Sequence, residues 1–141
     1  MQLNKLAKFV RTDMFEGKYE TNESETIDSY DLLNRYIFDN GLERPSFNIK
    51  RTRGYWGMTD GRMNIEDEKF FVQEIILTNK FPHKAMFIAT LAHEMIHQFQ
   101  WEVLSPERHA QGKESIMSHG PSFFAWRKVL SEYMIPLRRQ M

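Results

Sequence analysis

Cysteine is absent from the 141-residue chain, and its absence narrows the kinds of site that the protein can build. Without cysteine there is no disulfide bond, no thiolate metal ligand and no cysteine-type zinc ribbon. Any zinc site must therefore draw its ligands from histidine, aspartate, glutamate and water.

Long apolar runs are also missing from the sequence. No stretch is long enough to span a bilayer, and the first residues lack the continuous apolar segment of a signal peptide, so we expect a cytoplasmic protein without a membrane partner. Hydrophobic residues make up 41% and charged residues 27% of the chain, as in folded globular proteins. The length predicts a single domain over residues 1–141, with an N-terminal helix and loop at 1–26 and a core at 27–135.

An excess of charge of either sign is absent as well. The 19 basic and 19 acidic side chains give a formal net charge of zero, so the protein as a whole offers little attraction for nucleic acid. DNA stays a candidate partner, and we expect a monomer. Small basic groups of the kind usually found on solvated surfaces occur at Lys50, Arg51 and Arg53, and at Arg138 and Arg139.

Apolar residues at helical spacing predict a short first helix that ends near Phe15. A second helix carries the apolar stripe from Tyr30 to Ile37 and stops at Asn40-Gly41. A third helix follows Pro82, which we expect in its first turn, and continues to Trp101. We interpret the next stretch, 101–116, as an irregular loop. A last helix, 123–133, is expected to stop by Pro136.

Between the second and third helices the apolar residues alternate with polar ones, which is typical of strands. Asp60-Gly61 is a dipeptide favoured in tight hairpin turns, so we expect it to join two strands. These strands predict a small, mostly antiparallel sheet packed with an active-site helix and flanking helices, in the α+β class. The expected strands surround Phe47 and Ile49 and cover residues 53–59, 62–65 and 74–78.

The third helix contains His93-Glu94-Met95-Ile96-His97, which has the pattern H-E-x-x-H. Residues four apart lie on the same helix face, so His93 and His97 can bind one metal ion, and neutral imidazole suits zinc. Glu94 is placed to act as general base toward a water on that metal. The pattern also arises by chance on surface helices, but the apolar run at 85–92 predicts a buried helix, where polar side chains need partners.

A catalytic zinc ion needs a third protein ligand and an open position. The metzincin extension of the motif is excluded, because Gln100 and Val103 stand where it requires glycine and histidine. Two histidines remain downstream, His109 in a polar stretch and His119 just before Gly120-Pro121 at a predicted helix start. We favour His119, because a rigid attachment point holds a side chain at fixed geometry. The acidic candidates are Glu102, Glu107 and Glu114.

Two segments of the chain together resemble the SprT-like metallopeptidases, a family that includes the bacterial SprT proteins and the protease domain of Spartan. Leu91 to His97 matches the family's H-E-x-x-H helix, and His119-Gly120-Pro121-Ser122-Phe123 matches its H-G-P-x-F context. The order of the predicted elements from Tyr30 to Tyr133 is also similar to that of the family. It implies a zincin-like minimal protease core, in which His93, His97 and His119 bind zinc and Glu94 is the catalytic base.

The chain also departs from many members of that family. These members carry a cysteine-rich zinc ribbon or DNA-binding extensions after the protease core, whereas this sequence has no cysteine and stops soon after its last predicted helix. The likeness to Spartan implies proteolysis of DNA-associated proteins, and a short chain is also expected to act with a partner or on different substrates.

Two functions follow from these observations. The first is a zinc-dependent endopeptidase with Glu94 as general base, whose extended protein or peptide substrate lies along the sheet edge; manganese is the alternative metal. The second is a catalytically inert adaptor that binds DNA or a protein, in which zinc only ties helices together. Four protein ligands would close that site, with Glu114 or His109 as the fourth. We favour the enzyme, because Glu94 has no structural role in a closed site.

Overall fold

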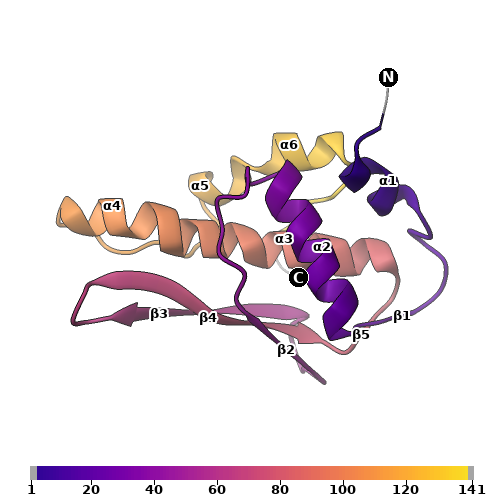
Figure 1. Cartoon of the computed structure of the whole chain (residues 1–141), viewed down its shortest axis with the longest axis horizontal. Coiled ribbons are helices and arrows are strands. Elements are labelled where there is room, and N and C mark those ends of the chain that lie inside the picture. Colours follow the sequence, from indigo (N-terminus) through magenta and orange to yellow (C-terminus); the bar gives the residue numbers. More distant parts are fainter. Residues whose placement is uncertain (1–2, 140–141) are drawn as a thin grey trace.

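A computed structural model describes residues 3–139; residues 1, 2, 140 and 141, which the single-domain prediction includes, lie outside this part (Figure 1). Short helices, a long central helix and a small sheet follow one another along the chain. In order, the elements are α1 (Lys5–Arg11), β1 (Tyr19–Glu20), α2 (Glu23–Tyr36), β2 (Ser46–Lys50), β3 (Gly57–Asn64), β4 (Lys69–Thr78), β5 (Lys80–Phe81), α3 (Lys84–Phe99), the π-helix η1 (Gln100–Leu104), α4 (Ser105–Ala110), α5 (Pro121–Phe124) and α6 (Arg127–Glu132).

The sheet has the strand order β2-β4-β3, with β2 parallel and β3 antiparallel to β4. A separate two-stranded antiparallel pair joins β1 to β5. Helices and this mostly antiparallel sheet confirm the predicted α+β class. In the described part of the chain β3 has only β4 as a partner, so its other edge is open to a further strand.

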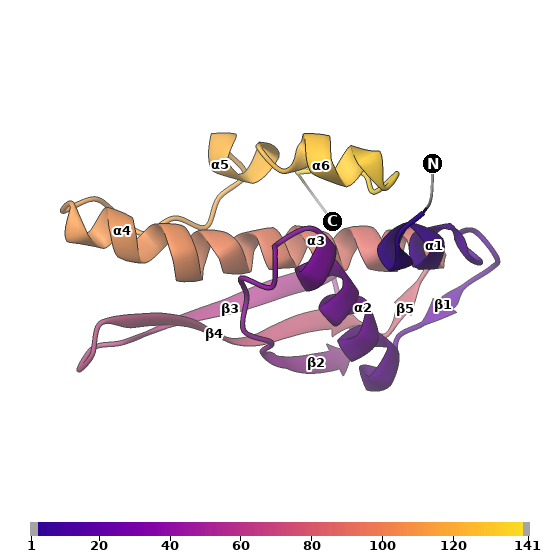
Figure 2. The same cartoon turned by 45° about the horizontal axis from the view of Figure 1, so that its top comes forward.

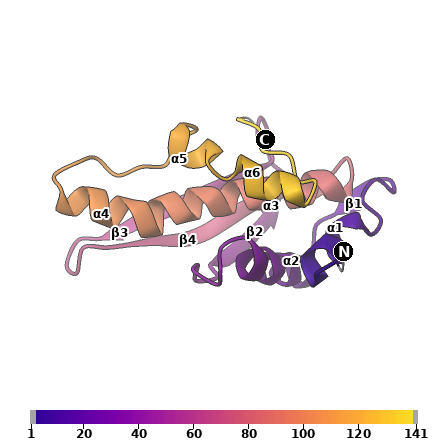
Figure 3. The same ribbon diagram turned by 90° about the horizontal axis from the view of Figure 1, so that it is seen from above.

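Helix α3 lies between the sheet and the C-terminal helices α5 and α6, and it continues through η1 into α4 as one long rod (Figure 2). Seen from above, α1 and α2 lie along one side of this rod (Figure 3). A helix covered on several sides must be apolar nearly all round, which explains the run Ala85–Ala92. The largest fully buried side chains of the core are Tyr30, Phe81, Phe87, Phe123, Leu6, Leu33, Ile75, Leu77, Ile88, Leu91, Met95 and Ile96.

Strand β3 turns a face of small residues toward α3. A Cβ atom on Gly57 would lie 2.8 Å from Thr90 Cγ2 and 3.0 Å from Glu94 Cγ, and one on Gly61 would lie 2.9 Å from the indole of Trp101. All three distances are shorter than normal carbon contacts. Glycine at these two positions therefore lets α3 and its continuation η1 pack directly on the strand.

The predicted hairpin turn at Asp60-Gly61 is wrong. These residues lie inside β3, where the pairing with β4 shifts between Asp60 and Gly61, and the chain turns instead at residues 65–68. Gly61 is required by the close approach of Trp101, whose Nε1 also donates a hydrogen bond to the carbonyl of Arg62 at 2.9 Å. Long-range packing thus overrides the local turn preference.

The stretch 101–116 is not an irregular loop throughout, as the sequence had predicted. Its first part continues the rod as η1 and α4. Pro106 does not end the rod, and it follows directly on the π-helix as the second residue of α4. The expected last helix is likewise two short helices, α5 and α6. A hydrogen bond from the Trp126 N–H to the Phe123 carbonyl, 3.3 Å long, tightens the chain between them.

The remaining differences concern the ends of strands and helices. Strand β3 begins at Gly57 rather than at residue 53, and β4 begins at Lys69 rather than at residue 74. Helix α1 ends at Arg11 rather than near Phe15, and Asp13 beyond it has a φ of 53°, which no helix continues. Helix α2 begins at Glu23, inside the predicted N-terminal segment 1–26, because Asn22 caps it by accepting from the Glu25 N–H. Pro82 precedes α3 rather than lying in its first turn, and His83 is the residue that caps that helix.

None of the helices within residues 3–139 combines the length and the hydropathy that crossing a lipid bilayer requires.

Candidate metal centre

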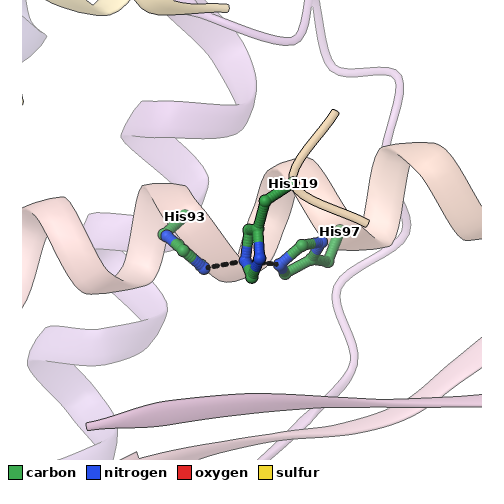
Figure 4. A group of neighbouring side chains, drawn as sticks. All are labelled: His93, His97 and His119. Atoms are coloured by element: carbon green, nitrogen blue, oxygen red, sulfur yellow. Dashed lines mark hydrogen bonds between the residues drawn. The ribbon is translucent and has the colours of Figure 1, made fainter. Parts of the chain in front are cut away.

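Three imidazole rings converge on one point beside the sheet (Figure 4). His93 and His97 come from adjacent turns of α3, and His119 comes from the segment just before α5. The Nε2 atom of His119 lies 3.1 Å from that of His97 and 3.2 Å from that of His93. The ligand atoms of all three residues lie within 4.8 Å of one another, so together they could hold a metal ion.

These distances are close to what a tetrahedral zinc ion requires. Bonds of about 2.0–2.1 Å from zinc to nitrogen place two tetrahedral ligands about 3.3–3.4 Å apart. The two Nε2 separations that involve His119, 3.1 and 3.2 Å, differ from this by a few tenths of an ångström, and the ligand atoms of His93 and His97 lie within 4.8 Å of each other. Three protein ligands leave one tetrahedral position for a small molecule.

The environment keeps the three histidines neutral, the form that binds metal. Burial, together with the neighbouring His97 and His119, lowers the pKa of His93 to about 3. Burial is also the main cause that lowers the pKa of His97 and of His119, and Arg139 adds to it at His119. His93 and His97 are buried, whereas His119 is exposed at the rim, where it can meet solvent.

Glu94 is almost completely buried beside this cluster, with Oε2 3.7 Å from Nε2 of His93. Burial raises the pKa of Glu94 to about 7, and a hydrogen bond from Thr59 opposes that rise. The Thr59 hydroxyl donates to Glu94 Oε1 at 2.8 Å. A carboxyl group with a pKa near neutrality both accepts and returns a proton readily at physiological pH.

Phe123 packs against all three imidazole rings. Its fully buried ring lies with its centroid 4.8 Å from that of His93, 5.1 Å from that of His97 and 4.9 Å from that of His119. The sequence placed Phe123 on an apolar helix face but gave no sign that it contacts every histidine of the cluster. An apolar support of this kind limits the rotation of the rings and excludes water behind them.

Two further side chains at the site had escaped the sequence reasoning. Gln100, singled out only because it is not glycine, bonds Nδ1 of His97 through Oε1 at 2.9 Å. Thr59 lies 35 residues before Glu94 on a strand, and no sequence pattern connects the two. Gln100 bonds His97 and Thr59 bonds Glu94, and contacts of this kind leave no periodic pattern in the sequence.

The other candidate ligands lie elsewhere in the described structure. Glu102 accepts from the Val72 N–H at 2.8 Å and from Gln98 at 3.1 Å, so it serves the packing of η1 on β4. His109 packs on the ring of Phe70, with centroids 5.8 Å apart. Within residues 3–139, neither of these side chains, nor Glu107 or Glu114, joins the group formed by the three histidines.

A cavity of about 800 Å³ opens over the cluster. The start of β3 and the loop before it line the cavity with Trp56, Gly57 and Thr59, and the segment before α5 lines it with Met117 and His119. Arg138 and Arg139, from the segment after α6, also line it. The carboxylate of Glu94 and the imidazoles therefore face a space large enough for a peptide segment, next to the open edge of the sheet.

The chain matches no family model, no curated protein and no solved structure.

Proposed function

We propose that this protein is a metal-dependent endopeptidase of the SprT-like type, with zinc as its metal. One observation carries the proposal: three imidazole nitrogens and the buried carboxylate of Glu94, whose pKa is raised to about 7, face the same open cavity. The combination of neutral nitrogen ligands, an adjacent proton acceptor and room for a substrate matches what hydrolysis of a peptide bond requires.

His93, His97 and His119 are the residues that would hold the metal ion. When bound there, the ion supplies Lewis acidity, which polarises a peptide carbonyl and makes a water molecule more acidic. Histidine ligands suit zinc, and manganese is the alternative.

Glu94 carries the proton through the reaction. Its carboxylate takes a proton from the attacking water as the new C–O bond forms, and it then gives that proton to the amide nitrogen as the C–N bond breaks. The second proton of the water also passes to the nitrogen, so the products are a carboxylate and a protonated amine, and no other reactant is needed. Thr59 holds the carboxylate during both transfers through its 2.8 Å hydrogen bond.

The open edge of β3 is where we expect the substrate backbone to bind. Gly57, Met58 and Thr59 line the cavity and belong to this edge strand. An extended peptide that pairs with an edge strand is held by backbone hydrogen bonds, which accept many side-chain sequences. We therefore propose unfolded or flexible protein segments as substrates, with DNA-associated proteins as one candidate class.

The experiment compares wild type with Glu94→Gln on an unfolded protein substrate in the presence of zinc. The variant should keep zinc and lose cleavage, because the amide cannot accept the proton. Glu102→Gln is the matched control, a half-buried glutamate on the same helical rod that is outside the cavity, and it should cleave as wild type does. Undiminished cleavage by Glu94→Gln would exclude the proposed mechanism.

A second measurement separates the enzyme from the adaptor. X-ray absorption of the zinc-loaded protein should give three histidine nitrogens and one exchangeable oxygen ligand. A shell of four protein ligands with no water would favour a closed, structural site. Repeating the cleavage assay with and without DNA tests whether DNA-associated substrates are preferred.

A further inference from the structure

We propose that Gln100 is a positioning residue for the metal site: it selects the tautomer of His97 and ties this ligand to the segment that carries His119. This inference rests on the proposed function insofar as a metal ion is the ligand of the cluster. It assigns a role to a buried amide that the reaction itself does not use, and it is argued from hydrogen bonds within the chain.

The backbone of Ser118 determines which way the amide of Gln100 points. The Ser118 carbonyl, which can only accept, takes a hydrogen bond from Gln100 Nε2 at 2.9 Å. The Ser118 N–H, which can only donate, points to Gln100 Oε1 at 3.3 Å. Rotating the amide by a half turn would set donor against donor and acceptor against acceptor, so Oε1 must be the atom that faces His97.

The orientation of the amide in turn determines the proton on His97. Oε1 of Gln100 lies 2.9 Å from Nδ1 of His97 and can only accept, so the proton of the neutral ring is on Nδ1. Nε2 then carries a lone pair, and this is the atom that faces Nε2 of His119. Without Gln100, the neutral ring could also carry its proton on Nε2, and that proton would have to move before Nε2 could bind metal.

The same amide also reaches the third ligand. Gln100 Nε2 donates to the Ser118 carbonyl and, at 3.0 Å, to the hydroxyl of Ser122, so its bonds fall on both sides of His119. Gln100 is fully buried, and it lies at the junction between α3 and η1. One side chain thus links two ligands that are 22 residues apart in the sequence.

His93 has no side-chain partner like Gln100 for its second ring nitrogen. Its Nδ1 is buried and makes no hydrogen bond of normal geometry within the described residues, although the nearby backbone of Arg138 raises the pKa of the ring. A metal-binding histidine usually donates its second ring N–H to an acceptor, which fixes the ring and its tautomer, and the loss of that acceptor lowers metal affinity about 10–100-fold. The positioning of the site therefore depends heavily on Gln100.

The first measurement needs no variant. Two-bond ¹H–¹⁵N correlation spectra of the metal-free, histidine-labelled full chain report which nitrogen of His97 carries its proton. We expect Nδ1–H for His97. A proton on Nε2 of His97 would overturn the inference, whether or not the protein binds metal.

The second measurement is zinc affinity, from competition with a chelator of known strength, for wild type, Gln100→Leu and Gln98→Leu. Gln98 is a matched control: it is also fully buried near the end of α3, but it bonds Tyr30, Glu43 and Glu102 outside the site. We expect a 10–100-fold loss of affinity for Gln100→Leu and less than about a threefold change for Gln98→Leu.

The outcomes separate this inference from the proposed function. Equal zinc affinities for wild type and Gln100→Leu would refute a positioning role but would not contradict the proposed peptidase function. Equal losses of zinc affinity in Gln100→Leu and Gln98→Leu would mean that Gln100 contributes only to packing. Absence of zinc binding by wild type would instead contradict the proposed function, and the spectrum of metal-free His97 would still decide the tautomer. The spectrum likewise decides if Gln100→Leu does not fold.

Discussion

The hydroxyl group of Thr59 donates a hydrogen bond to Oε1 of Glu94 at 2.8 Å, and it also lies 3.0 Å from the Glu94 backbone carbonyl. The bond crosses the interface between β3 and α3, where Gly57 allows the strand to approach the helix closely. The sheet therefore holds the proposed general base, while the helix and the segment before α5 hold the imidazoles. This division of roles leads to the following predictions.

Replacing Thr59 by valine should shift the acid limb of a plot of kcat/KM against pH to higher pH. Burial raises the pKa of Glu94, and the bond from Thr59 lowers it, so loss of the bond raises the pKa further. The base must be ionised to work, and a hydrogen bond to a charged group worth about 1.5 kcal/mol corresponds to a shift of about one pH unit. Thr26→Val, at another buried threonine far from the cavity, should leave the limb in place.

Glu94→Gln should make the metal-free protein more stable above pH 7 than wild type, but not near pH 4. The folded-state pKa of about 7 exceeds the ordinary 4.5, so the folded wild type binds more protons between these values and loses stability as the pH rises through them. The full difference corresponds to about 3 kcal/mol.

Urea unfolding in the presence of a chelator, at pH 4 and at pH 8, measures this difference. The exposed Glu107→Gln serves as control and should show the same free energy of unfolding relative to wild type at both values. A Glu94→Gln variant that is less stable than wild type at pH 8 would contradict the destabilising burial of the carboxylate.

Gly57→Ala should reduce kcat by at least about tenfold, because misplacing a catalytic group by even a fraction of an ångström is costly. The new methyl carbon would lie 2.8 Å from Thr90 Cγ2 and 3.0 Å from Glu94 Cγ, so the glutamate must move. Gly61→Ala is the matched control on the same strand face. Its methyl would meet Trp101 and Met117 instead, and we expect a loss of about 1–3 kcal/mol in stability with kcat nearly unchanged. Equal losses of kcat in both variants would mean that general strain, not the position of Glu94, is responsible.

Added zinc should raise the melting temperature of wild type and of His109→Ala, but not of His119→Ala. A ligand at about 100 times its Kd stabilises the folded state by about 2.7 kcal/mol, and the ion would join α3 to the segment before α5. His109 lies away from the cluster, whereas His119 supplies a nitrogen 3.1 Å from that of His97. Scanning calorimetry at fixed zinc concentration measures the shift, and an undiminished zinc effect in His119→Ala would remove His119 from the site.

The sequence alone predicted the helix that carries His93, Glu94 and His97, its burial, the α+β class, and His119 as the favoured third ligand. These features are accessible because they are local. Two histidines four residues apart lie on the same face of a helix, and the apolar run just before them indicates that this helix is buried. A histidine directly before Gly120-Pro121 likewise has a rigid attachment point that can be recognised from its neighbours.

The failures share a different cause. Asp60-Gly61 has the local preference of a turn, but the need of Trp101 to pack against Gly61 keeps it inside β3. Pro106 lies in the stretch predicted as a loop, but it follows directly on the π-helix η1 and the helical rod continues through it. In both cases a contact or a helix position outside the local pattern decided the conformation.

Only the tertiary structure decided which groups surround the histidines: Thr59 from β3, the ring of Phe123 and the amide of Gln100 held by Ser118. Their separations along the chain follow no regular period. Hydrogen bonds inside a helix join residues four apart, whereas these contacts form only where the tertiary fold brings distant segments together. The sequence thus determined the chemical groups and the helix that presents two of the histidines. The fold determined their hydrogen-bond partners, their supports and the space in front of them.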